Sequence, residues 1–138
     1  FYASVFAIWR VGRVPPIPSD TPAGPAGSVP VVEFTLAGQP FMAISAGPLF
    51  KFNESISFLI YCDTQEEIDD YWAKLSAVPE AEQCGWLKDK YGLSWQVVPT
   101  DMDEMLKNGS KEQIARVTQA FLKMKKFDLA KLRQAYNA

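Results

Sequence analysis

The chain has 138 residues, of which 48% are hydrophobic and 22% are charged, with a net charge of −2, ten prolines and no histidine. This length suits one ordinary domain or two small sub-domains, whose core needs no disulfides. The absence of histidine excludes a Ser-His-Asp triad, a Cys-His pair, a His-ligated zinc site and a two-His-one-carboxylate iron site.

The first part of the chain predicts strands separated by one long loop. Residues 7–14 predict a strand, and the Pro- and Gly-rich residues 15–30 predict a loop of a length that is often functional. Residues 31–37 and 40–46 predict a hairpin that turns at Gly-Gln, and residues 55–62 predict a further strand.

A helix is predicted to begin at Thr64, because Glu67 follows at the spacing of a capping box. Four apolar residues then recur at helical spacing and predict one stripe that faces a core. They are Ile68, Tyr71, Trp72 and Leu75. The helix is expected to stop at Pro79.

Two more strands and three helices are predicted to complete the chain. The strands cover residues 83–89 and 93–98, and a short helix covers residues 101–107. A second capping box opens a helix at Ser110, and Asp128 caps the last one. The core-facing residues of these two helices are predicted to be Ile114, Val117, Phe121, Leu122, Leu129, Leu132 and Tyr136. This order of elements indicates an α+β domain with a mostly antiparallel sheet and no parallel βαβ run.

The alternation of side chains along the strands predicts one apolar face and one mixed face for each strand. In residues 55–62 the apolar face holds Ile56, Phe58, Ile60 and Cys62, and the mixed face holds Ser55, Ser57, Leu59 and Tyr61. Glu33 and Gln96 lie on the mixed faces of their own strands. These faces either line a concave small-molecule site or meet water, and the sequence leaves both open.

The candidate ligand-binding residues follow from this pattern and from the joint near residue 50. They are Glu33, Phe50, Phe52, Ser55, Ser57, Tyr61 and Gln96. Glu33 needs burial to act as a base and is more often a solvated charge. Cys84 could be activated by Lys88, but a structural thiol is favoured. No catalytic residue is assigned.

Charge is unevenly spread. Residues 107–138 hold eight Lys or Arg against two acidic residues (+6), and residues 1–106 hold six against fourteen (−8). The basic tail is expected to dock on the acidic remainder and not on nucleic acid, because no aromatic residues interleave with its basic ones.

The expected location is cytoplasmic. No apolar run approaches the ~20 residues of a membrane helix, so no membrane partner is expected. Cys62 and Cys84 are too few for a disulfide-rich secreted protein and are expected to be reduced. Because the chain starts at Phe1, its N-terminus is treated as incomplete.

Several segments resemble the PhnB-like branch of the vicinal oxygen chelate superfamily, which includes glyoxalases, bleomycin-resistance proteins and extradiol dioxygenases. The most specific is QCGWLKDKYGLSWQVVP at residues 83–99. Further matching segments are residues 1–6, 22–29, 47–54 and 122–126. This branch is often labelled demethylubiquinone methyltransferase.

The resemblance implies paired βαβββ modules whose curved sheets form a cleft, commonly in a homodimer. One domain then spans residues 1–138, with a first module at 1–46 that lacks its opening strand, a second at 55–98 and a helical tail at 101–138. Metal-dependent relatives use His and Glu ligands, whereas Ser55 and Gln96 stand near two such positions here. Hydroxyl and amide groups are poor replacements, so no metal and no other cofactor are expected.

Two functions remain open, and whether the protein is an enzyme is not decided. The first is metal-independent binding of a small aromatic or quinone-like metabolite in the cleft. The second is a non-catalytic dimeric interaction protein with a vestigial cleft, in which the C-terminal helices serve dimerisation. Methyl transfer from S-adenosylmethionine is disfavoured, because no Gly-rich turn joins a strand to a helix.

Overall fold

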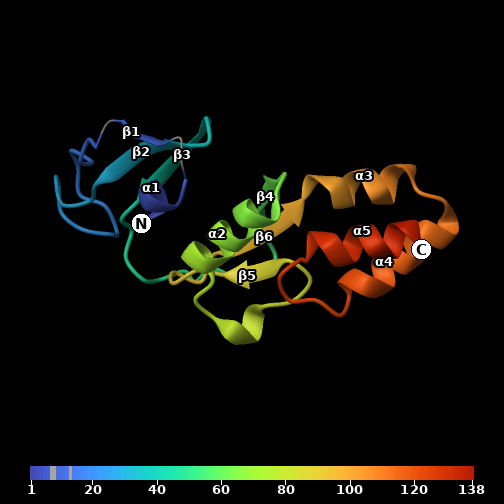
Figure 1. Cartoon of the computed structure of the whole chain (residues 1–138). Coiled ribbons are helices and arrows are strands. Elements are labelled where there is room, and N and C mark those ends of the chain that lie inside the picture. The colour runs from blue at the N-terminus through green and yellow to red at the C-terminus, as the bar shows by residue number, and fades with distance from the viewer. Residues whose placement is uncertain (7–8, 13) are drawn as a thin grey trace. The chain divides into compact units, whose positions relative to one another are not determined.

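The computed structural model describes residues 1–6, 9–12 and 14–138, which form two compact units, Phe1–Lys51 and Phe52–Ala138 (Figure 1). Each unit contains a three-stranded sheet and at least one α-helix, so the predicted α+β class is confirmed. Residues 7, 8 and 13 of the predicted first strand lie outside the described residues.

The first unit carries the short helix α1 (Tyr2–Val5) and an antiparallel sheet in the order β1-β2-β3. Its strands are β1 (Trp9–Val11), β2 (Val31–Leu36) and β3 (Gln39–Ile44). The predicted β2–β3 hairpin is present, but its turn is Ala37-Gly38 and not Gly38-Gln39. A type I′ hairpin turn needs positive φ at both of its central residues, and Ala37 (48°) and Gly38 (81°) have it while Leu36 pairs with Gln39.

The second unit begins with β4 (Ser57–Cys62), α2 (Gln65–Leu75), a 3₁₀ turn (Pro79–Ala81), β5 (Trp86–Lys88) and β6 (Ser94–Pro99). The strand order is β4-β6-β5, with β6 parallel to β4 and antiparallel to β5. The expectation of no parallel βαβ run was therefore wrong. The connection through α2 and β5 is long enough to return β6 beside β4 in the same direction, and β5 takes the outer edge.

Helix α2 covers one face of this second sheet. Thr64 caps the helix in the predicted capping box with Glu67. Ile68 and Leu75 of the apolar stripe are fully buried, and they lie over the sheet face that buries Ile60 and Val97. The helical period of α2 and the alternation of the strands therefore place these four side chains in one core.

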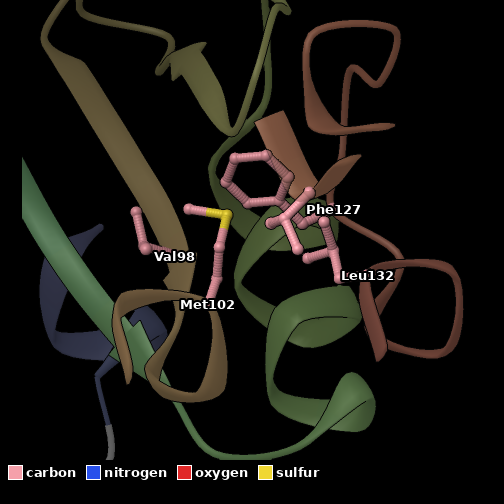
Figure 2. Close-up of a cluster of buried hydrophobic side chains, with 5 residues drawn as sticks. Val98, Met102, Phe127 and Leu132 are labelled. Atoms are coloured by element: carbon pink, nitrogen blue, oxygen red, sulfur yellow. The ribbon is translucent and has the colours of Figure 1, made fainter. Parts of the chain in front are cut away.

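Three C-terminal helices follow β6, and their apolar faces pack within the same unit. They are α3 (Thr100–Asn108), α4 (Lys111–Phe121) and α5 (Leu129–Asn137). Ser110 with Gln113 and Asp128 cap α4 and α5 as predicted. Figure 2 shows the resulting cluster, which comprises Val98, Met102, Val117, Phe127 and Leu132.

Three residues predicted to lie on apolar faces are exposed instead, and Phe58 of β4, at 37%, is the least exposed of them. Leu122 is 55% exposed, because α4 ends at Phe121 and Leu122 lies in the cap beyond it. Ile56 is 71% exposed, because β4 begins one residue later at Ser57. The errors at Leu122 and Ile56 lie at element ends, where periodicity stops applying.

The basic tail pairs with acidic residues of its own unit. Lys126 pairs with Asp69 of α2, and Arg133 pairs with Asp101 of α3. This is the docking on the acidic remainder that the charge distribution predicts. In the described part of the chain, no helix combines the length and apolarity that crossing a bilayer takes.

Candidate functional site

The sheet of the second unit has one face under α2, and we call its other side the open face. Strand alternation and the observed register place eight side chains there. Seven of them define the candidate surface, namely Ser57, Leu59 and Tyr61 of β4, Ser94 and Gln96 of β6, and Trp86 and Lys88 of β5. The eighth, Val98 of β6, is buried in the cluster with the C-terminal helices, so those helices cover that end of this side of the sheet.

A polar pair connects two neighbouring rows of the open face. Gln96 donates an amide N–H from Nε2 to Ser57 Oγ at 2.8 Å. The Ser57 hydroxyl accepts this bond and retains its own proton, which it can donate to a ligand oxygen. Ser57 and Gln96 were both predicted site residues, and the parallel pairing of β4 with β6 brings them together.

Apolar and aromatic groups surround this pair. Leu59, the register partner of Gln96, is 49% exposed, and Tyr61 on the same strand is 56% exposed. Trp86, the register partner of Gln96 on the other side, is half-buried. A few placed hydrogen-bonding groups within an apolar and aromatic lining are the usual composition of a small-molecule site.

At one end of the open face, Ser57, Ser94 and Lys88 form a row across the three strands. Lys88 forms an ion pair with Glu54, which lies just before β4. Hydrogen bonding to Lys88 holds the pKa of Glu54 below its ordinary value. Ser94 is 1% exposed, and its Oγ has no hydrogen-bond partner among the residues that the structure describes.

Asp89 orders the turn that joins β5 to β6. Its Oδ1 accepts from the backbone N–H of Tyr91 (2.8 Å) and of Leu93 (3.1 Å), and its Oδ2 accepts from Trp95 Nε1 (2.9 Å). The side chain is fully buried, so these donors replace water. The Asp-Lys-Tyr-Gly sequence at residues 89–92 is a local signal for such an Asx turn.

Three predicted site residues near the joint do not contribute to the open face. Ser55 is exposed ahead of β4, and its hydroxyl donates to Asn53 Oδ1. Phe50 is 89% exposed in the first unit, and Phe52 is 61% exposed in the second. Both rings lie outside the strands, so strand alternation does not assign them to either face of a sheet.

Glu33 belongs to the first unit, on the mixed face that its strand alternation predicts. It is exposed and lines a hollow of about 500 Å³ with Arg10, Thr35 and Met42. Glu33 was considered either as a buried base or as a solvated surface charge. Its exposure to water favours the surface charge.

Neither cysteine is placed for nucleophilic chemistry. Burial raises the pKa of Cys62 to about 12, so its thiol stays protonated at neutral pH. Cys84 Sγ lies 3.6 Å from the carbonyl oxygen of Phe121, while the Lys88 ammonium pairs with Glu54. Both thiols are free of disulfides.

Trp86, Lys88 and Ser94 lie on the open face but are not among the predicted ligand-binding residues. Strand alternation was applied to residues 55–62 and 93–98 but not to residues 83–89, and a lone serine on a mixed face carries no signal of its own. The register of β5 with β6 is what joins them to Gln96.

The side chains do not fit a divalent transition metal. In the described ranges no three His, Cys, Asp or Glu side chains gather as a metal would require. The two residues near the expected ligand positions are hydrogen-bonded elsewhere, Ser55 to Asn53 and Gln96 to Ser57. A hydroxyl and an amide are also weak ligands for these ions.

The fold and the open face define a small α+β protein with sheet-borne polar groups in an apolar setting. A family model described as 3-demethylubiquinone-9 3-methyltransferase matches residues 1–98, and the chain belongs to this PhnB-like family. A solved structure of a Bacillus cereus protein, described as a PhnB protein and a 3-demethylubiquinone-9 3-methyltransferase, is 30% identical over 72% of this chain and 85% of its own, with a TM-score of 0.55. No curated protein matches the chain. The family resemblance drawn from residues 83–99 and the other motifs is thus confirmed.

Proposed function

We propose that the protein binds a small aromatic or quinone-like metabolite on the open face without a metal ion. The observation that carries this proposal is the Gln96–Ser57 hydrogen bond between exposed Leu59 and Tyr61 and half-buried Trp86. The pair presents hydrogen-bond donors at a fixed position, and the apolar neighbours favour a flat ring over water.

A quinone suits this arrangement because it has two carbonyl acceptors at opposite ends of an apolar ring. Ser57 donates its remaining proton to one carbonyl oxygen, and the second Gln96 N–H is available to the same atom. Removal of Gln96 releases the Ser57 hydroxyl to rotate and deletes a donor. Gln96 is therefore the side chain on which binding depends most.

The family description also names a methyltransferase, and this activity fits the chain poorly. A common S-adenosylmethionine site uses a Gly-rich turn between a strand and the following helix of a parallel βαβ unit. Here β4 and β6 are parallel, but β4 joins α2 through Asp63-Thr64, which contains no glycine. Helix α2 begins instead with a side-chain capping box.

The alternative function is a dimeric interaction protein with a vestigial cleft. The observation that favours it is the exposure of Leu49 (79%), Phe50 (89%) and Phe52 (61%) within four residues of chain. Exposed apolar side chains of this size are typical of an interaction surface. The two functions are compatible, and we propose that the protein is a homodimer in either case.

The test of the proposed function is titration of purified protein with duroquinone, a fully substituted quinone that does not add to thiols, followed by thermal unfolding and calorimetry. We expect a saturable rise in melting temperature for the wild type. Gln96→Leu should weaken binding by about tenfold or more, because a donor to the carbonyl is lost inside an apolar setting.

Gln119→Leu is the matched control, because Gln119 is an exposed glutamine of α4 outside the open face. It should bind duroquinone like the wild type. An unchanged melting temperature with duroquinone and with a panel of aromatic metabolites would count against ligand binding and favour the interaction protein.

A further inference from the structure

The row of Ser57, Ser94 and Lys88 at one end of the open face has a feature that the proposed function does not use. Glu54 leads into β4 at one edge of the sheet, whereas Lys88 lies on β5 at the other edge. Their ion pair therefore joins residues from the two edges of the sheet at the end where Lys88 is the register partner of Ser94. We call this end of the open face, with Ser57, Ser94 and Lys88, the corner. The Glu54 carboxylate already pairs with Lys88 there.

Ser94 shows that the corner is built for a further acceptor. Its side chain shares a face with Ser57 and Lys88, and it is 1% exposed with no hydrogen-bond partner for Oγ in the described residues. Buried hydroxyls almost always have a partner, because an unpaired one loses its hydrogen bonds to water. An acceptor oxygen placed between Lys88 and Ser94 would remove this cost.

The carboxylate that now occupies the corner is easily displaced. Glu54 is 64% exposed in its side chain and lies in the turn before β4, whereas the Lys88 side chain is 22% exposed on a strand. Because the Glu54 carboxylate is mostly in water, this ion pair contributes little stability, so its loss costs the fold little. Glu54 can move away while Lys88 remains in the row.

We infer that this corner binds the carboxylate of a small aromatic acid, with Lys88 supplying the positive charge and Ser94 and Ser57 supplying hydroxyl donors once Glu54 has moved aside. The inference rests on the proposed function, and it names the ligand's class. Lys88 and Ser94 come from adjacent strands that the Asp89 turn holds in register, so the two donors are already ordered before binding.

The position of Trp86 sets the size of such a ligand. Trp86 lies two residues before Lys88 on the same face of β5, and Gln96 is its register partner. Two residues of a strand span about 7 Å. A carboxylate at the Lys88 row therefore places a ring system of one or two rings at the row of Trp86 and Gln96, where a flat group can stack.

The experiment compares 2-naphthoate with its neutral amide, 2-naphthamide, by calorimetric titration of the full chain. We expect wild-type protein to bind the naphthoate at least tenfold more tightly. Lys88→Met should abolish this preference and leave naphthamide binding unchanged. Glu54→Gln should strengthen naphthoate binding several-fold, because the competing carboxylate is gone, with no gain for naphthamide.

Lys74→Met is the matched control, since Lys74 is also an ion-paired lysine of the second unit but lies on α2, away from the open face. It should keep the preference. Because Lys88 is largely covered and its variant could misfold, the exposed Glu54 variant provides an independent test. Equal binding of both compounds to wild type, or no gain in Glu54→Gln, would overturn the inference while the proposed function stands. Binding of neither compound while duroquinone still binds would overturn the inference alone, and failure of duroquinone as well would overturn both.

Discussion

Gly85 occupies a turn where the backbone and the packing both require glycine. Cys84 and Gly85 have φ values of 49° and 80°, and the turn lies between the paired residues Gln83 and Trp86. A Cβ on Gly85 would lie 2.3 Å from a ring carbon of Phe127, which is itself buried in the C-terminal core. This close approach joins the start of β5 to the helical tail.

We predict that Gly85→Ala destabilises the protein by about 3 kcal/mol, of which about 1–2 kcal/mol comes from the left-handed conformation and the rest from overlap with Phe127. Gly92→Ala is the matched control, because Gly92 has φ 84° but open space around its Cβ position. It should cost about 1 kcal/mol. Urea unfolding measures both, and equal losses would show that Phe127 contributes nothing.

Helix capping is the feature with the clearest consequence at the scale of the element. Asp128 begins α5, and its Oδ1 accepts from the backbone N–H of Lys131 at 3.0 Å. This hydrogen bond, together with the Lys131 side chain, holds the pKa of Asp128 below its ordinary value of 3.8. The carboxylate therefore contributes stability that is present above the unfolded pKa and is lost as pH falls through the folded pKa.

We predict that Asp128→Ala lowers the free energy of unfolding by about 1 kcal/mol at pH 7, because one backbone N–H of α5 loses its acceptor. Asp128→Asn should retain most of the stability, since an amide oxygen also caps. Urea unfolding between pH 7 and pH 3 should show the deficit of the Ala variant shrinking at the acidic end. A deficit that is constant over this range would contradict the role of the charged cap.

At the scale of the whole molecule, the exposed apolar segment near residue 50 predicts self-association. Light scattering coupled to size exclusion should give a mass twice the chain mass of 15.4 kDa. Phe52→Ser should weaken the dimer by about tenfold or more, because exposed aromatic residues often dominate an interface.

The control for this prediction is Leu122→Ser, which removes an exposed leucine from the C-terminal tail. It should leave the dimer intact, since the apolar faces of the tail helices already pack in their own unit. Loss of the dimer in the Leu122 variant alone would instead support dimerisation through the tail. A monomeric wild type would refute the prediction.

Much of the fold could be predicted because its signals are local. The capping boxes at Thr64 and Ser110 and the cap at Asp128 lie within four residues of the groups they satisfy, and all three are present. The motifs that carry the family resemblance are likewise read from consecutive residues. Local hydrogen bonding and periodicity also defined the buried stripe of Ile68 and Leu75.

The tertiary structure decided which polar side chains meet. Ser57 and Gln96 are 39 residues apart, and they are neighbours because β6 pairs in parallel with β4, which no local pattern specifies. The same pairing, together with that of β5 with β6, places Ser94 in one row with Ser57 and Lys88. Alternation assigns a residue to a face, but only the order and register of the strands determine its partners on that face, because those depend on contacts between distant segments.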